Sequence, residues 1–276
     1  MAINVPPEEL ERLKQKARAM RRTIVTIIYE AGSGHPGGSL SAIDFLLALY
    51  EKVLRHDPKN PHWPERDRFV LSKGHGCPAL YTVLADQGYF PEETLHTLRK
   101  LGSPLQGHPD MHTLPGLEAS TGSLGQGICV AVGMALAGKL DRQPYHVYAM
   151  CGDGEIDEGS VWEAAMCASH HHLDNFTVIV DRNKVQQCGK TKEIMDSEPL
   201  ADKWRAFNWT VVEIDGHDFA QVLDALDASR RRPGHPTAII SQTIKGKGVS
   251  FMEGDPGFHG KAPSKEQYEQ AMRELA

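Results

Sequence analysis

The length and composition of the chain already exclude several classes of protein. It has 276 residues, of which 40% are hydrophobic and 24% charged, and its formal net charge is −6. This composition excludes disordered, collagen-like and disulfide-framework proteins. The 30 basic and 36 acidic side chains give no electrostatic reason to expect nucleic acid or an anionic membrane as a partner.

The cysteines and the amino terminus favour a soluble cytoplasmic protein. None of the five cysteines belongs to a CxxC pair, so neither a zinc ribbon nor a dithiol redox site is indicated. The longest run of small apolar residues, 127–138, is too short and too rich in glycine to span a bilayer. The first residues, MAINVPPEEL, lack the basic and then apolar order of a signal peptide.

Hydrophobic periodicity predicts alternating helices and strands. The chain begins with an amphipathic helix over 8–31, followed by a loop over 33–38 and a helix over 41–53. Runs rich in β-branched or aromatic residues predict strands at 68–72, 146–151, 176–181, 210–215 and 237–242. Helical stretches separate these strands at 127–140, 160–171 and 219–230. The pattern is typical of a three-layer α/β domain with a mostly parallel sheet flanked by helices. We expect one domain over 1–276, with a loop-rich tail at 245–263.

Glycine-rich loops follow the predicted strands, where parallel sheets bind their ligands. Two of these loops, 151–155 and 181–185, carry Asp153 and Asn183, which are 30 residues apart (183 minus 153) at the ends of successive strands. We expect their carboxylate and amide oxygens to converge. These hard donors suit Mg²⁺ or Ca²⁺ that shares its coordination with phosphate oxygens, a backbone carbonyl and water. A third loop, 120–127, precedes a helix.

Fourteen histidines are an unusual share, and five of them directly follow a glycine: His35, His75, His108, His217 and His235. Histidines in glycine loops indicate a polar site more than a core. His217 and His235 are interpreted as turn residues. The run at 170–172 is no chelating cluster, because consecutive helical residues point about 100° apart. Two interpretations stay open for Lys245 and Lys247, a phosphate site or a solvated loop that orders against a partner.

The motifs and their order resemble those of transketolases. The GDG at 152–154 followed by Asn183 is similar to the thiamine diphosphate and metal motif of thiamine-dependent enzymes. Five further stretches resemble transketolase in the order that the family carries them: 33–38 (SGHPGG), 68–75 (RFVLSKGH), 107–110 (GHPD), 120–127 (STGSLGQG) and 245–252 (KGKGVSFM). Whole transketolases continue into a pyrimidine-binding domain and a carboxy-terminal domain. The chain therefore resembles the amino-terminal subunit of a split transketolase, with the thiamine diphosphate-binding fold of its diphosphate-binding (PP-type) domain.

This resemblance implies roles for individual residues. It assigns a divalent metal, Mg²⁺ or else Ca²⁺ or Mn²⁺, to Asp153, Asn183 and the carbonyl of Val185. Together with these three, it assigns contacts with thiamine diphosphate to His75, Gly122, Ser123, Leu124, Gly154, Glu155 and His259. It assigns catalysis to His35, His75, His108, His259 and Glu158. Within that set His35 and His259 are the leading acid–base candidates, with pKa values near neutrality. His108 would orient donor hydroxyls, and Glu158 would join a carboxylate network across the dimer.

The implied reaction is a glycolaldehyde transfer of the pentose phosphate pathway, in which a two-carbon ketol unit passes from a ketose phosphate to an aldose phosphate. The cofactor supplies the carbanion chemistry. The resemblance implies activity only with a separate carboxy-terminal subunit, in an α2β2 heterotetramer.

Three alternatives remain: the α-type subunit of a thiamine-dependent 2-oxo acid dehydrogenase, a fragment similar to 1-deoxyxylulose-phosphate synthase, and a non-catalytic regulatory module. The SGHPGG, GHPD and KGKGVSF stretches argue against the first two. The presence of Asp153, Asn183, His35 and His75 together argues against the third.

Overall fold

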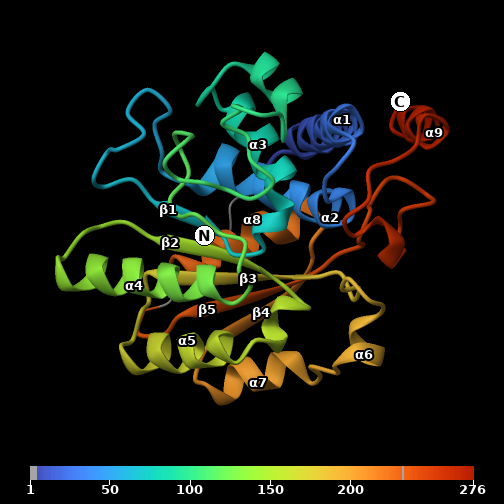
Figure 1. Ribbon diagram of the computed structural model, residues 1–276. Coiled ribbons are helices and arrows are strands. Elements are labelled where there is room, and N and C mark those ends of the chain that lie inside the picture. Colours follow the sequence, from blue (N-terminus) through green and yellow to red (C-terminus); the bar gives the residue numbers. More distant parts are fainter. Residues whose placement is uncertain (1–4, 232) are drawn as a thin grey trace.

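A parallel five-stranded sheet forms the centre of the computed structural model, which describes residues 5–231 and 233–276 (Figure 1). The strand order is β1-β2-β3-β5-β4, and every neighbouring pair is parallel. The strands are β1 (Arg68–Leu71), β2 (Val147–Gly152), β3 (Phe176–Arg182), β4 (Thr210–Asp215) and β5 (Thr237–Gln242). All five predicted strands and the parallel α/β architecture are confirmed.

Helices cover both faces of the sheet, which gives the three predicted layers (Figure 1). One face packs against α1 (Pro7–Ala31), α2 (Pro36–Ala48), α3 (Cys77–Asp86) and α8 (Phe219–Ser229). The other packs against α4 (Gln126–Leu140), α5 (Gly159–His170) and α7 (Leu200–Ala206). Strand β2 is buried on both faces: Tyr148 and Met150 pack in the first core, whereas Val147, Ala149 and Cys151 pack in the second. A strand buried on both faces needs apolar residues throughout.

The helix predicted over 41–53 begins earlier than expected. Helix α2 starts at Pro36, and a π-helical turn (Leu49–Val53) continues it. The predicted loop over 33–38 was therefore wrong for 36–38. Proline suits the first helical position because its missing N–H has no helical partner there. Gly37 follows because a Cβ at that position would lie 3.0 Å from both Lys245 Cγ and the Phe258 carbonyl oxygen. Tertiary packing thus requires glycine in this helix, although glycine has a low intrinsic helix propensity.

Some elements escaped prediction. Helices α3, α6 (Thr191–Ile194), α7 and α9 (Lys265–Glu274) were not expected, nor were the 3₁₀ turns 74–76, 92–97, 155–157 and 256–258. Between β5 and α9 the chain forms only the last of these turns. Helix α9 packs on α1, where Tyr268 stacks on Tyr29 with ring centroids 4.3 Å apart. Within the described ranges, no helix combines the length and apolarity needed to cross a membrane.

Candidate functional site

The carboxyl ends of β2, β3 and β5 open into a pocket of about 230 Å³. Segments from across the chain line it, which agrees with the rule that parallel sheets bind ligands at this edge. Eight residues predicted for the site are among the lining residues: His75, Leu124, Asp153, Gly154, Glu155, Asn183, Val185 and His259. Lys73 and Lys245 also line the pocket, and no role had been expected for Lys73.

Asp153 is a buried carboxylate that is held by backbone groups. Its side chain follows β2, and the residue is 4% exposed. Both carboxylate oxygens accept backbone N–H groups, from Gly154 at 3.0 Å and from Lys184. Among the described residues no lysine or arginine forms an ion pair with it. Burial, together with the charge of Asp181, raises the pKa of Asp153 to about 7. A cation bound here would remove this penalty, so the environment fits the expected metal.

Asn183 and Val185 bring two further oxygens to the same edge. The Asn183 amide nitrogen donates to Asp181 at 3.3 Å, while its Oδ1 accepts the Val185 N–H at 3.1 Å. The described residues contain no group of three or more His, Cys, Asp or Glu side chains placed to hold a metal. The expected set is of another kind, one carboxylate, one amide and one carbonyl, and it suits a hard cation that also takes oxygens from a bound anion.

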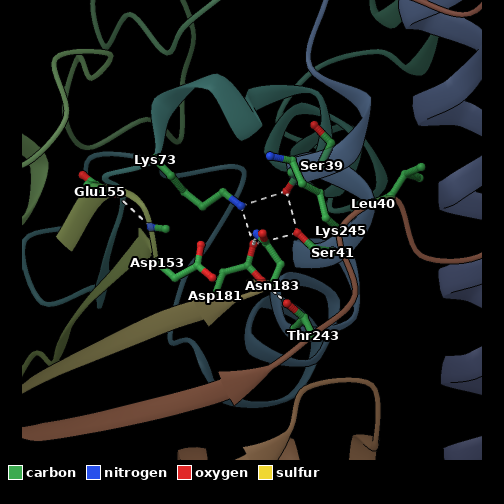
Figure 2. A network of polar contacts seen from close by, with 12 residues as sticks. Ser39, Leu40, Ser41, Lys73, Asp153, Glu155, Asp181, Asn183, Thr243 and Lys245 are labelled. Carbon is green, nitrogen blue, oxygen red and sulfur yellow. Dashed lines mark hydrogen bonds and ion pairs between the residues drawn. The ribbon is translucent and has the colours of Figure 1, made fainter. Parts of the chain in front are cut away.

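Lys73, which lines the pocket, also anchors a buried polar network (Figure 2). The residue is 1% exposed, pairs with the Asp181 carboxylate and donates to the Gly38 carbonyl at 2.9 Å. Asp181 also accepts the hydroxyls of Ser41 at 2.7 Å and Thr243 at 2.5 Å. Burial would raise the pKa of Asp181, but these partners hold it below its usual value. The charge of Asp181 is therefore compensated by side chains of the protein itself, unlike that of Asp153.

Lys245 is a second buried lysine, so the alternative of a solvated loop is wrong for this residue. It is 2% exposed, and its Nζ lies 2.9 Å from the Val185 carbonyl oxygen and 2.9 Å from His259 Nδ1. Within the described part of the chain no carboxylate pairs with it. Burial, with the nearby charge of Lys73, lowers its pKa to about 8. A buried ammonium group that forms no direct ion pair is suited to an anionic ligand.

The four predicted histidines form one cluster, in which His75 and His259 line the pocket and His35 and His108 lie beside them. The His35 ring centroid lies 5.3 Å from that of His75, 5.3 Å from that of His259 and 6.2 Å from that of His108. Burial is the main cause that lowers the pKa of His35 to about 4 and that of His259 to about 3, with nearby cations adding to it. Both pKa values lie below the neutral range that had been expected, so these imidazoles are neutral at pH 7.

Arg99 stands beside this cluster and was not singled out from the sequence. Its guanidinium donates to Ser33 Oγ at 3.1 Å and lies 3.4 Å from His35 Nδ1. It forms no ion pair with a carboxylate in the described residues. The charge of Arg99 contributes to the lowered pKa values of His35 and His108. The segment around 99 held no motif that could have revealed this contact, which joins residues 64 positions apart.

The carboxylate of Glu155 is engaged in hydrogen bonds within the protein and is not free in the pocket. It accepts the Ser72 hydroxyl at 2.5 Å, the Gly125 N–H at 3.0 Å and the Gly152 N–H at 3.0 Å. The residue is 2% exposed, and burial raises its pKa. One carboxylate thus joins the end of β1, the loop before α4 and the end of β2.

The remaining predicted residues lie outside the pocket lining. Gly122 packs beside the His108 ring, because a Cβ there would lie 3.1 Å from two of its atoms. Ser123 is exposed in the same loop. Glu158 is exposed just before α5, beside Gly125. The fold therefore does not bring Glu158 to the histidine cluster.

Comparison with known proteins identifies the class. The chain belongs to the transketolase family through its thiamine diphosphate-binding domain, whose family model matches residues 13–276. It is 49% identical over 263 residues to SqwG, a subunit of the 6-deoxy-6-sulfo-D-fructose transketolase of Clostridium sp. (strain MSTE9), covering 95% of this chain and 96% of that protein. It is 43% identical over 268 residues to one subunit of the apulose-4-phosphate transketolase of Phocaeicola vulgatus, covering 97% and 95%.

The length of the chain distinguishes it from whole transketolases. The crystal structure of transketolase from Campylobacter jejuni superimposes with a TM-score of 0.91 at 35% identity, covering 96% of this chain but 43% of that one. The chain thus spans less than half of that enzyme, whereas it matches the two relatives named above over nearly their whole length. The expected membership of the class of transketolase amino-terminal subunits is confirmed.

Proposed function

We propose that this chain is the diphosphate- and metal-binding half of a two-subunit transketolase, which transfers a two-carbon ketol unit from a ketose to an aldose. One observation carries the proposal: Asp153, a buried carboxylate that no cation pairs with among the described residues, lies in the same pocket as Asn183, Val185 and two of the four clustered histidines, His75 and His259. Both the fold and the family membership support it.

In this proposal Asp153, Asn183 Oδ1 and the Val185 carbonyl hold Mg²⁺. Thiamine diphosphate, when bound, supplies carbanion chemistry. Its remaining contacts are assigned to His75, Gly122, Ser123, Leu124, Gly154, Glu155 and His259. Lys245 joins them, since its ammonium lies 2.9 Å from a proposed metal ligand and pairs with no carboxylate in the described chain. Glu155 acts through the backbone of Gly125 and Gly152, whose N–H groups it accepts.

The chain's own groups fix where protons lie on two histidines. The Lys245 ammonium is a donor only, so His259 Nδ1 accepts from it and the ring proton is on Nε2. By the same reasoning the Arg99 guanidinium directs the His35 proton to Nε2. Both imidazoles then present an N–H donor to substrate oxygen atoms. A bound anion would raise their pKa values and equip them for acid–base transfer. His108 orients hydroxyl groups, and Glu158 acts at the subunit interface.

The partner in this proposal is a transketolase carboxy-terminal subunit, in a cytoplasmic α2β2 heterotetramer. The substrates are sugars with an anionic end, sugar phosphates among them. The named relatives act on sulfofructose and on apulose 4-phosphate, so a place in the pentose phosphate pathway stays a prediction. An assay of the assembled complex would offer xylulose 5-phosphate and 6-deoxy-6-sulfofructose as donors, with ribose 5-phosphate as the acceptor. Ketol transfer is expected from at least one donor, and 2-oxo acid decarboxylation without ketol transfer would contradict the proposal.

A binding experiment tests the metal assignment directly. Asp153→Ala in the assembled complex should lower affinity for thiamine diphosphate with Mg²⁺ about 100-fold, because a charged ligand to the metal is lost. Isothermal titration calorimetry measures it. Asp202→Ala, which removes an exposed carboxylate on α7, is the matched control and should bind as the unmodified protein does. Equal affinity in the two variants would refute the role of Asp153.

A further inference from the structure

A buried chain of three polar side chains lies behind the pocket and has no role in the function proposed above. Arg21 of α1 pairs with Asp44 of α2 at 2.5 Å, and the same carboxylate oxygen lies 2.6 Å from His217 Nδ1. The exposed fractions of these side chains are 9% for Arg21, 5% for Asp44 and 13% for His217. His217 follows β4, so the interpretation of it as a simple turn residue is incomplete.

The contacts of His217 determine its tautomer. Its Nε2 lies 2.9 Å from the backbone nitrogen of Ile244. A backbone N–H can only donate, so Nε2 carries no proton and acts as the acceptor. The proton is then on Nδ1, which donates to the Asp44 carboxylate. Asp44 is ionised, since Arg21 and His217 hold its pKa below the usual value despite burial. His217 is therefore a neutral imidazole with both nitrogens engaged.

The segment that His217 holds, Thr243–Gly246, is the one that carries Lys245 to the pocket, and it is named here the strap. Thr243 donates its hydroxyl to Asp181 at 2.5 Å. Gly246 N donates to the Gly37 carbonyl at 3.0 Å. Between these two anchors Ile244 N donates to His217, and Lys245 reaches the Val185 carbonyl and His259.

The loop that carries His217 is itself packed against the strap. Gly216 N donates to the Gln242 carbonyl at 2.8 Å. A Cβ at Gly216 would lie 2.1 Å from Ser241 Oγ and 2.6 Å from Thr243 Cγ2, so only glycine allows this approach. The imidazole is thus held from two sides, by the Asp44 carboxylate and by its own loop.

We propose that His217 is a positioning residue for Lys245: the Arg21–Asp44 pair fixes its tautomer, and Nε2 then holds the strap so that the Lys245 ammonium reaches Val185 and His259. The proposal deepens the function proposed above and rests on it for the link to cofactor binding. It concerns a hydrogen bond that lies outside the pocket, since His217 is not among the lining residues.

Two amide substitutions separate the two hydrogen bonds of the imidazole. Glutamine places its carbonyl oxygen where Nε2 lies and can still accept from Ile244, whereas asparagine places a donor near Nδ1 and leaves Ile244 N without an acceptor. His217→Gln should therefore behave nearly as the unmodified chain, and His217→Asn should release the strap. His235→Asn is the matched control, because His235 also follows a glycine but is exposed.

The first readout is the protection of Lys245 from reductive methylation by formaldehyde and cyanoborohydride, quantified by mass spectrometry on the full chain. The exposed Lys261 serves as the internal reference. The modification rate of Lys245, which is 2% exposed, should rise about tenfold in His217→Asn and less than about threefold in His217→Gln, a difference that reflects one lost hydrogen bond. His235→Asn should leave it unchanged.

The second readout is the affinity of the assembled complex for thiamine diphosphate with Mg²⁺, which should fall about tenfold in His217→Asn and recover in His217→Gln. A merely structural role would lower the thermal midpoint of both variants equally, with Lys245 protection and affinity unchanged, and would overturn the inference. Equal labelling in the Gln and Asn variants would also overturn it. If the unmodified complex binds no cofactor, the proposed function fails, while the labelling result still decides the role of His217.

Discussion

Each end of the sheet buries an aspartate, but the two aspartates differ in the partners that surround them. Asp67, just before β1, has a fully buried side chain. It accepts from Arg230 at 2.7 Å, from the Arg55 guanidinium at 3.2 Å and from the backbone nitrogens of Arg55 and His146 at 2.9 and 2.8 Å. Among the described residues, Asp153, just after β2, has only backbone donors.

The pKa directions express this difference. Burial would raise the pKa of both carboxyl groups, but Arg230 and the other donors hold that of Asp67 below its usual value. In the described chain Asp153 forms no ion pair of this kind, and burial raises its pKa to about 7. Buried charges are tolerated when they are paired. The amino edge of the sheet is thus complete in itself, whereas Asp153 at the carboxyl edge forms no ion pair within the described chain, which supports the metal site proposed there.

Removing the charge at the complete edge should have the largest effect. Asp67→Asn removes the charge of a fully buried carboxylate and leaves the partly exposed guanidinium groups of Arg55 and Arg230 without it, so the free energy of unfolding should fall by about 3 kcal/mol. Urea unfolding at pH 7 measures this, with the exposed Asp202→Asn as the control. A loss below about 1 kcal/mol would show that the amino edge does not depend on this pairing.

A smaller effect should follow from His146, the histidine of the complete edge. Burial lowers its pKa to about 3 from the ordinary 6.5. The unfolded chain therefore binds a proton at His146 near pH 6.5, whereas the folded chain binds it only near pH 3. The contribution of His146 to stability is constant above pH 6.5 and falls as the pH drops between these values. His146→Gln, which cannot titrate, should lose about 2–3 kcal/mol less between pH 7 and pH 4. Parallel curves for the two proteins in urea unfolding would contradict this.

The smallest effect, and the opposite sign, is expected at the carboxyl edge. Without metal, Asp153→Asn should stabilise the chain at pH 8 by about 1–2 kcal/mol, because a neutral amide avoids burying an unpaired charge. The gain should vanish as the pH falls from 7 toward 4, because the carboxyl group of the folded chain becomes protonated over this range and its buried charge is lost. Urea unfolding in EDTA at both pH values measures it. Destabilisation at pH 8 would mean that the two edges do not differ as described.

The sequence was a good guide wherever a feature depends on local order. Strand ranges followed from short apolar runs, and Asp153 and Asn183 met because successive parallel strands end at one edge. The start of α2 did not follow, since Gly37 is required by contact with Lys245, which is 208 residues away (245 minus 37). Only the fold could show that contact.

The limits of prediction at the site have the same origin. Lys73 and Lys245 lay in motifs that had been noted, yet lysine is usually exposed, and only the fold shows them buried. The resemblance to transketolases assigned Glu155 a contact with the cofactor. Its three donors come from 72, 125 and 152, and two of these lie far away along the chain.

The shared carboxylate of Glu155 has an evolutionary consequence. It links Ser72, Gly125 and Gly152, one from each of three motifs that are separate in the sequence. A substitution that moves either glycine backbone or removes the Ser72 hydroxyl changes the shared hydrogen bonding, so its fitness effect depends on the other two motifs. Relatives are therefore expected to exchange these positions together or to keep them all, and laboratory recombination that breaks the set should yield epistatic losses greater than the sum of the single changes.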